Sequence, residues 1–348
     1  MTHIALSIIT SGLAIGTIIT MTSHHWILAW MGLEINTLAI IPLIIKNHHP
    51  RAVEAATKYF FTQCAASALI LFSNVLNSWL TGQWAVSIDT YNSTQATFLA
   101  VAIAMKLGIA PFHLWFCEVL QGVPYGTGVI LATWQKLAPL ALLIKIAPYT
   151  NLNLMVTLGV ISMVVGGWGG INQTQIRKIL AFSSTAHLGW VLVILKFSTT
   201  YAMLNFGIYL LLTLTLFFTF MVLASTHMSQ LAMAWSKVPS VAALALMVLL
   251  SLAGLPPTTG FLPKLLISAE LIKQGMPLLT LTILMSTLLS FFFYLRLVYV
   301  VAINAPANSP TSTPKWMYKK KNILALPLMA SLLLFPLAPL VVSLFNAI

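Results

Sequence analysis

The sequence predicts an all-α polytopic membrane protein with about eleven transmembrane helices. Of its 348 residues, 59% are hydrophobic and only 6% are charged, and the mean hydropathy is +0.95. A soluble domain carries about 25% charged residues, so this chain could not cover itself with a wetted surface. Eleven apolar runs are each long enough to cross a bilayer. They are 4–21, 26–45, 59–80, 96–116, 123–146, 152–171, 175–195, 201–224, 240–270, 277–302 and 323–345.

The connections between these spans carry an uneven distribution of lysine and arginine. An odd number of spans places the two termini on opposite sides of the membrane. With the N-terminus inside, the inside connections hold Lys46, Arg51, Lys58, Arg177, Lys178, Lys237, Lys315, Lys319, Lys320 and Lys321. The outside connections hold only Lys145, Lys196 and Lys273. By the positive-inside rule, the N-terminus is expected to face the basic compartment.

The fourth and ninth spans are predicted to be broken helices. Gly108 and Pro111 follow Lys106 in the fourth span, and three prolines and two glycines in 254–263 precede Lys264 in the ninth. Proline removes a backbone donor and clashes with the preceding turn. Unwound backbone persists at membrane depth only where it is buried in protein or lines a wet cavity. Both breaks therefore indicate a functional cavity.

The position of the breaks predicts an internal repeat. Residues 1–150 and 151–302 each hold five spans, with the broken span fourth in each, and 303–348 add a loop and a final helix. Because five is odd, equivalent helices would run in opposite directions, as in transporters built from inverted repeats. Equivalent spans then pair Lys106 with Lys264, and Glu34 with His187.

Four ionisable residues stand in the middle of apolar spans: Glu34, Lys106, Lys136 and Lys264. Each costs roughly 2.5–3.5 kcal/mol at the bilayer centre, so they indicate an ion or proton path. A lysine removed from water loses part of its preference for the charged form and can exchange a proton, which arginine cannot. The lysines are too central to reach an interface by snorkelling. A purely structural pairing role for Glu34 stays open.

His187 and His113 are secondary relay candidates, because imidazole titrates near neutrality. Both could instead be packed, hydrogen-bonded core histidines. No nucleotide-binding loop, flavin fingerprint or CxxC motif is present, so no redox cofactor and no metal are expected in this chain. The net charge of +12 lies in short connections and spans without a basic face, which argues against nucleic acid as a partner.

Five motifs carry a resemblance to a known family. They are WILAWMGLEINT from Trp26, KLGIAPFHLW from Lys106, WQKLAP from Trp134, RKILAFSSTAHLGW from Arg177 and LAGLPPTTGFLPK from Leu252. In this order they resemble the chain 2 family of mitochondrial NADH–ubiquinone oxidoreductase, respiratory complex I, which is one of its antiporter-like subunit families. The likeness extends over the whole chain.

The resemblance implies a core membrane-arm subunit of this H⁺-translocating reductase, which couples NADH oxidation and ubiquinone reduction elsewhere in the complex to proton translocation. By motif, Glu34 resembles the carboxylate of the entry half, and Lys106 its partner on the broken helix. Lys136 resembles the bridging lysine, and Lys264 the lysine of the second broken helix. NADH, FMN, iron–sulfur clusters and ubiquinone would be bound by other subunits, with no cofactor here.

The expected partners are other membrane-arm subunits of complex I and lipids such as cardiolipin, and the chain is not expected to function alone. Its expected location is the mitochondrial inner membrane, with the N-terminus in the matrix and the C-terminus in the intermembrane space. Two alternatives remain: an autonomous cation/proton antiporter of the same fold, and a structural linker of the membrane arm without its own proton path.

Two geometric predictions follow from the proton-path interpretation. Glu34 and Lys106 should interact directly or through one water, because opposite charges influence each other mainly within ~4–6 Å. Lys106, Lys136, His187 and Lys264 should lie near one depth of the membrane, since buried ionisable groups gather where water can solvate them.

Overall fold

The computed structural model describes residues 3–86, 93–256 and 258–303. Over these residues the regular structure is helical, and eight helices are long and apolar enough to cross a membrane. Two further apolar helices are shorter, Ser93–Leu107 and Pro239–Ala253. The prediction of an all-α membrane protein is confirmed. The predicted eleventh span, 323–345, lies outside the described residues, so the count of eleven stays a prediction.

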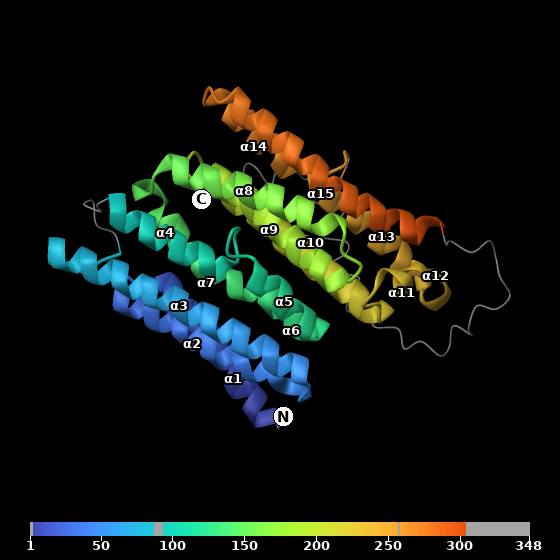
Figure 1. Ribbon diagram of the computed structural model, residues 1–348, viewed down its shortest axis with the longest axis horizontal. Coiled ribbons are helices and arrows are strands. Elements are labelled where there is room, and N and C mark those ends of the chain that lie inside the picture. Colours follow the sequence, from blue (N-terminus) through green and yellow to red (C-terminus); the bar gives the residue numbers. More distant parts are fainter. Residues whose placement is uncertain (1–2, 87–92, 257, 304–348) are drawn as a thin grey trace. The chain divides into compact units, whose positions relative to one another are not determined.

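The chain folds into two compact units, Met1–Gly159 and Val160–Ile348. The helices of the first unit are α1 (His3–Thr22), α2 (Trp26–Ile44), α3 (Pro50–Thr81), α4 (Ser93–Leu107), α5 (Leu114–Gly122), α6 (Tyr125–Ala132) and α7 (Trp134–Ile146). Two short 3₁₀ turns, Ile45–Asn47 and Ala147–Tyr149, follow α2 and α7. Figure 1 shows α1, α2 and α3 side by side along their lengths.

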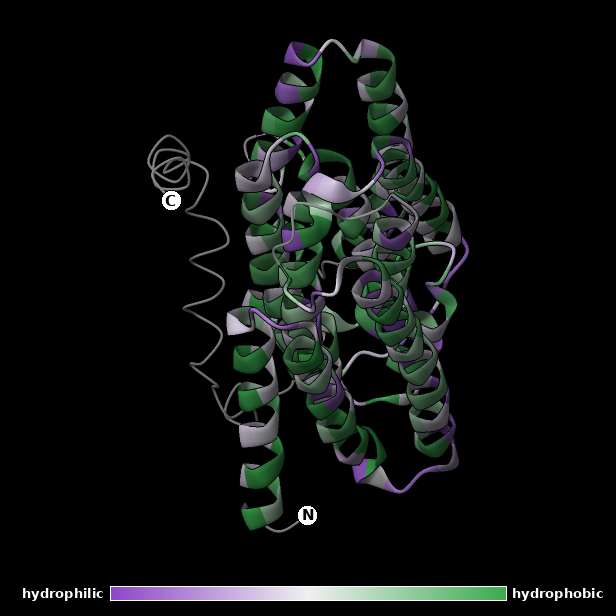
Figure 2. Ribbon diagram, turned by 90° about the vertical axis from the view of Figure 1, so that its left-hand side faces the viewer, coloured by the Kyte–Doolittle hydropathy of each residue, from purple (hydrophilic) through white to green (hydrophobic). Residues whose placement is uncertain are grey.

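Helix α8 (Leu152–Ile171) contains the boundary between the two units. The helices that follow it are α9 (Ile176–Leu195), α10 (Thr199–Leu223), α11 (Met228–Ala232), α12 (Ala234–Lys237), α13 (Pro239–Ala253), α14 (Phe261–Lys273) and α15 (Pro277–Ile303). Hydrophobic residues run along the helices of the chain, while hydrophilic residues gather mostly at helix ends and in connections (Figure 2). That pattern is expected where lipid replaces water as the surrounding medium.

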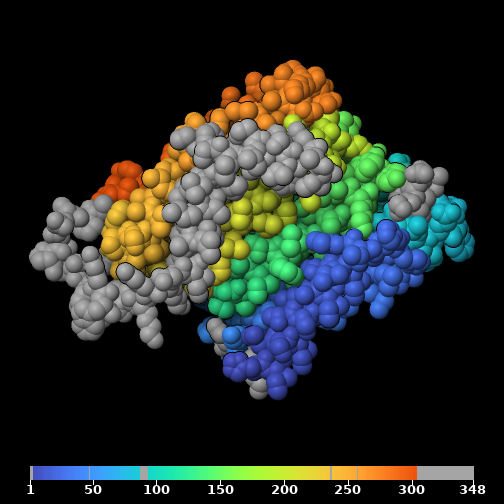
Figure 3. All heavy atoms as spheres, turned by 180° about the vertical axis from the view of Figure 1, so that it is seen from behind, coloured from blue at the N-terminus to red at the C-terminus, as the bar shows by residue number. Residues whose placement is uncertain are grey.

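Helix α1 lies at the surface of the first unit, where its side chains appear in dark blue in Figure 3. Four of its isoleucines are more than half exposed: Ile4, Ile8, Ile15 and Ile18. On its other face, Gly16 approaches α2 so closely that an added Cβ would lie 2.9 Å from the Gly32 carbonyl oxygen. Small residues at this contact therefore allow the two backbones to pack against each other, as in many membrane helix pairs.

Both predicted helix breaks are confirmed, and both begin in the same way. Helix α4 ends at Leu107 and α13 at Ala253, and each is followed by a glycine in the left-handed region, Gly108 with φ 72° and Gly254 with φ 85°. A glycine in this conformation ends a helix because it has no Cβ to clash with the preceding turn. The chain becomes helical again at Leu114 and at Phe261.

The fifth predicted span contains an interruption that the sequence analysis did not predict. Thr133 separates α6 from α7, with φ −114° and ψ −71°. Its hydroxyl donates a hydrogen bond to the Val129 carbonyl at 2.7 Å, a contact that often bends helices. Pro139 within α7 removes another backbone donor. Each of the three mid-span lysines therefore lies close to a helix interruption.

Helix α3 is longer than predicted and begins at Pro50 instead of residue 59. Proline suits the first position of a helix, where its missing N–H would have no partner. With 32 residues the helix is about 48 Å long, which exceeds the ~30 Å of the hydrocarbon layer. Lys58, expected in the preceding connection, lies inside this helix.

Each unit contains its own isolated β-bridge, and the two β-bridges occupy equivalent positions in the helix order of their units. In the first, an isolated β-bridge joins His25, before α2, to Ala85, in the α3–α4 connection. In the second, Gln175, before α9, is joined to His227, which follows α10. Two backbone hydrogen bonds of 2.9 Å form the first β-bridge, and two of 3.1 Å form the second.

Candidate functional site

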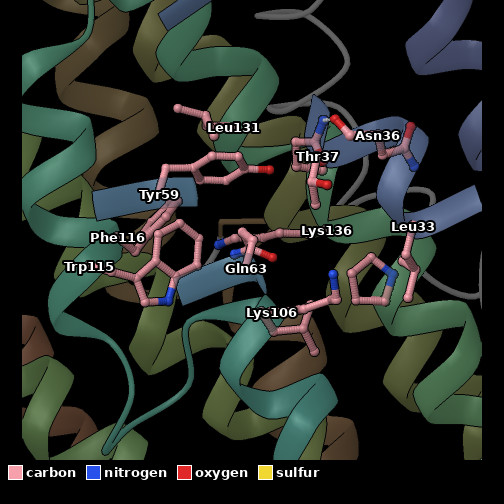
Figure 4. Close-up of a pocket in the computed structure, with 13 residues that line it drawn as sticks. Leu33, Asn36, Thr37, Tyr59, Gln63, Lys106, Trp115, Phe116, Leu131 and Lys136 are labelled. Atoms are coloured by element: carbon pink, nitrogen blue, oxygen red, sulfur yellow. Dashed lines mark hydrogen bonds between the residues drawn. The ribbon is translucent and has the colours of Figure 1, made fainter. Parts of the chain in front are cut away.

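The first unit contains a small cavity that brings Lys106 and Lys136 together (Figure 4). Helices α2 to α7 all contribute to its walls. The space open to the centre of a water molecule is about 20 Å³. A cavity of ~10–15 Å³ by this measure can hold a water, so this one has room for a bridging water. Its other polar lining residues are Asn36, Thr37, Tyr59, Gln63 and Gln135.

Lys106 lies in the last turn of α4, where the break begins, and its residue is only 5% exposed. Its Nζ has no hydrogen-bond partner among the described residues. The last turn of a helix carries partial negative charge from its free carbonyl groups, which favours a cation there. The break thus places an ammonium in a buried cavity without a fixed direct partner.

Lys136 lies in the first turn of α7, just after the interruption at Thr133, and is 3% exposed. Its Nζ stands 4.6 Å from the centroid of the Phe116 ring, in a cation–π contact. Phe116 belongs to α5, so this contact joins the helix that follows the first break to α7, the helix that follows the Thr133 interruption. Cation–π contacts are worth about 0.5–2 kcal/mol, depending on desolvation.

Glu34 lies on α2, on the turn that also carries the cavity residues Leu33 and Thr37, but it does not line the cavity. Its Oε2 accepts a hydrogen bond from the Thr37 hydroxyl at 3.2 Å, and its Oε1 has no hydrogen-bond partner among the described residues. The predicted direct contact with Lys106 is not formed, since the two make no ion pair within 4.0 Å. Contact through one water stays a prediction.

Aromatic side chains hold the first break in place. The indole N–H of Trp115, on α5, donates a hydrogen bond to the Met105 carbonyl, on α4, at 3.1 Å. The Trp115 ring makes edge contacts with Tyr59 at 5.7 Å and with Phe116 at 5.5 Å between centroids. A backbone carbonyl before the break, that of Met105, thus accepts a hydrogen bond from a side chain that follows the break.

In the second unit, a smaller cavity is lined by His187, Asn205, Tyr209 and Lys264, among others. The space open to the centre of a water molecule is about 10 Å³, at the lower limit for one water. Lys264 lies in the first turn of α14 and donates from Nζ to the Ala253 carbonyl oxygen at 2.9 Å. His187 and Lys264, both predicted as relay residues, therefore line the same cavity.

His187 stands between two tyrosines. Its Nε2 lies 3.5 Å from the Tyr294 hydroxyl oxygen, and its ring centroid lies 5.5 Å from that of Tyr209. His113 is also buried, at 8% exposure, but it lies in the turn between α4 and α5 and does not line the first cavity. His187 therefore lines a cavity together with a mid-span lysine, whereas His113 does not line the first cavity.

Sequence reasoning missed the uncharged polar residues of both cavities. Tyr59 and Gln63 come from α3, a helix to which no functional residue was assigned, and Tyr209 comes from α10. A buried glutamine in an apolar span is the signal that could have found the first cavity, because an amide in hydrocarbon requires partners. Among the described residues, no group of three or more His, Cys, Asp or Glu could hold a metal ion.

The amino-acid sequence matches one protein family and many relatives of known name. The model of the family "NADH:quinone oxidoreductase/Mrp antiporter, TM" matches residues 23–290. The NADH-ubiquinone oxidoreductase chain 2 of Xenopus laevis is 51% identical over 346 residues, which cover 99% of this chain and 100% of the relative. The same-named protein of Aquarana catesbeiana is 50% identical over 341 residues, covering 97% and 98%.

A solved structure shows the same architecture. A chain of respiratory complex I from Thermus thermophilus, with bound aureothin, superposes with a TM-score of 0.76 at 25% identity. The match covers 96% of this chain and 76% of the bacterial chain. The overall fold of this chain is therefore also found in a chain of respiratory complex I.

Proposed function

This chain belongs to the NADH-ubiquinone oxidoreductase chain 2 family, within the NADH:quinone oxidoreductase/Mrp antiporter family, and we propose that it conducts protons as a core membrane-arm subunit of complex I. In this role it couples NADH oxidation and ubiquinone reduction, performed elsewhere in the complex, to proton translocation. The observation that carries the proposal is the shared cavity of Lys106 and Lys136, with room for a water between helices that are both interrupted.

The proposed relay in the first unit uses only these side chains and water. A proton bound to Lys106 passes to a water in the cavity, and that water gives a proton to neutral Lys136. Lys106 is left neutral and is reprotonated from the side of Glu34, whose Oε1 has no hydrogen-bond partner among the described residues. A buried lysine can do this because desolvation brings its charged and neutral forms closer in free energy.

His187 and Lys264 form the proposed relay of the second unit. The Tyr294 hydroxyl and the His187 ring can hold a proton path, because imidazole accepts at one nitrogen while it donates from the other. Lys264 provides the exchangeable ammonium beside the second break. His113 stays a secondary candidate in the first unit. The two five-span halves, 1–150 and 151–302, are proposed to be inverted repeats, each with one relay.

The proposed setting is the mitochondrial inner membrane, with the N-terminus in the matrix and the C-terminus in the intermembrane space. Other membrane-arm subunits are the proposed partners, and lipids such as cardiolipin are proposed to cover the exposed apolar faces. NADH, FMN, iron–sulfur clusters and ubiquinone are proposed to be held by other subunits. The exposed isoleucines of α1 suit contact with lipid or with a neighbouring membrane helix.

The test is Lys106→Met in the assembled complex, reconstituted in sealed vesicles, with proton uptake measured against NADH oxidation. Loss of coupled proton transport with intact assembly is the expected result. Lys46→Met is the matched control, because Lys46 is an exposed lysine outside the cavity. Normal pumping by Lys106→Met would favour a structural linker. Cation/proton exchange by the isolated chain in liposomes would favour an autonomous antiporter.

A further inference from the structure

Two of the chain's five acidic residues converge on one lysine that the proposed relay does not use. The Nζ of Lys58, on α3, lies 2.6 Å from Glu54 Oε1 and 2.5 Å from Glu118 Oε2. The three side chains are 42%, 61% and 48% exposed. Because the chain has only five acidic residues, the use of two of them on one lysine indicates a specific function for this cluster.

The two ion pairs differ in what they connect. Glu54 is four residues before Lys58 on the same helix, so their contact joins α3 only to itself. Glu118 belongs to α5, the helix that follows the first break, so its contact with Lys58 joins α5 to α3. Only the second contact can fix the position of one helix against another.

The inner face of α5 forms part of the wall of the lysine cavity. Trp115 and Phe116, in its first turn, line the cavity, and the Phe116 ring lies under the Lys136 ammonium at 4.6 Å. Trp115 also contacts Tyr59, which is the residue next to Lys58 on α3. The α5 helix has only nine residues. Glu118 follows Phe116 by two residues, so a displacement of the helix at Glu118 is transmitted to Phe116 within one turn.

We infer that Lys58 and Glu118 are positioning residues, which hold α5 against α3 and so hold Phe116 beneath Lys136. The inference rests on the proposed function, because the position of Lys136 matters through proton transfer in the cavity. The pair itself touches neither cavity lysine. Since both side chains are half-exposed, dissolved salt screens the contact, so the coupling of proton transport to NADH oxidation should weaken as ionic strength rises.

The chain provides its own reporter for the position of α5. Cys117 lies between Phe116 and Glu118 and is only 4% exposed. Alkylation of its thiol by N-ethylmaleimide, followed by mass spectrometry of the intact complex, measures how often motion of α5 exposes this buried thiol. Cys64 on α3 serves as the internal reference for reagent and time.

Glu118→Gln is expected to raise the alkylation rate of Cys117 about two- to fivefold, the range that loss of one exposed ion pair produces. Coupled proton transport should fall by a similar factor. Glu54→Gln is the matched control, because it removes a carboxylate from the same lysine without unlinking the helices, and it should leave both readouts unchanged. The exchange of charges in Lys58→Glu combined with Glu118→Lys should restore slow alkylation.

Equal effects of Glu118→Gln and Glu54→Gln, or unchanged Cys117 alkylation in Glu118→Gln, would overturn the inference. The double variant Lys58→Glu with Glu118→Lys tests the inference even if Glu118→Gln assembles poorly. Faster alkylation of Cys117 in this double variant than in the unaltered protein would also contradict the inference. Cys117 reactivity reports the position of α5 alone. Normal pumping by Lys106→Met would instead overturn the proposed function while leaving the alkylation result intact.

Discussion

The Nζ of Lys264 donates a hydrogen bond to the Ala253 carbonyl oxygen at 2.9 Å and thereby spans the break between α13 and α14. The Ala253 carbonyl is one of the last four of its helix, which have no partner within the helix. Lys264 therefore satisfies freed backbone at the break in addition to its proposed relay role. Replacement of this lysine by an apolar residue therefore has a structural cost as well as a functional one.

Replacement of Lys264 separates these two roles. Lys264→Leu removes charge and donor and leaves the Ala253 carbonyl unpaired, which should destabilise the subunit by about 1–3 kcal/mol. Lys264→Gln keeps a donor without the charge, so it should assemble better than the leucine variant while pumping no better. Lys264→Arg keeps the charge but releases no proton at physiological pH. Full pumping by the arginine variant would make Lys264 a fixed electrostatic element.

Gly254→Ala should disturb the same break from the other side. Gly254 has φ 85°, and a Cβ there would lie 2.6 Å from the Lys264 Nζ. The left-handed conformation alone costs a non-glycine residue roughly 1–2 kcal/mol, and the contact would also displace the ammonium. We expect lower thermal stability of the complex together with reduced proton transport. Gly82→Ala is the matched control, with φ 71° and open space around its Cβ; it should lower stability alone.

Phe116→Leu tests the ring beneath Lys136. The variant keeps an apolar side chain but removes the aromatic face that contacts the ammonium. A cation–π contact of ~0.5–2 kcal/mol corresponds to a change of about 2- to 30-fold in rate. Proton transport per NADH oxidised should fall within this range, whereas Phe116→Tyr should retain most of it. Equal loss in both variants would indicate a packing defect instead.

Gln63→Leu tests whether water in the first cavity carries the proton. Gln63 is 4% exposed and lines the cavity with both lysines. A buried water needs two to four polar partners, so an apolar wall should disfavour it. We expect slower coupled turnover with normal assembly, and a larger solvent deuterium effect on turnover. Leucine at Asn77, a buried polar residue of the same helix that does not line the cavity, is the control.

The relation between Glu34 and Lys106 can be measured by a double-mutant cycle. Glu34→Gln and Lys106→Met should each reduce proton transport, and the double variant should lose less than the sum of both free-energy changes. Residues that share a network show coupling of about 0.5–3 kcal/mol. Additive losses would mean that the two residues act independently.

The sequence predicted the all-α architecture, both major breaks and the candidate status of the lysines that line the two cavities. These features depend on hydrophobic run length and on glycine and proline, which act locally and can be read from a single chain. Lys106 and Lys136 were predicted as relay residues because an ionisable side chain within a membrane span is costly, whichever helices surround that span.

Other features depend on contacts between distant segments and could not be predicted. The interruption at Thr133 comes from a side-chain hydrogen bond to Val129 and has no glycine or proline at the break. Gln63 reaches the cavity because α3 faces it, and Glu118 meets Lys58 because α5 returns along α3. The contact between Glu34 and Lys106, direct or through one water, was predicted from charge alone; no direct ion pair forms, and Thr37 occupies one oxygen of the carboxylate.

The two β-bridges, His25 with Ala85 and Gln175 with His227, bear on how the chain could have evolved. Their hydrogen bonds join backbone to backbone, so they are indifferent to the side chains at these positions. If the two halves arose by gene duplication, their sequences could diverge at all of these positions and the backbone hydrogen bonds would still form. Only proline at a donor position, such as Val86 or Met228, would remove a bond. Common ancestry of the two halves is therefore better sought in backbone geometry than in aligned residues.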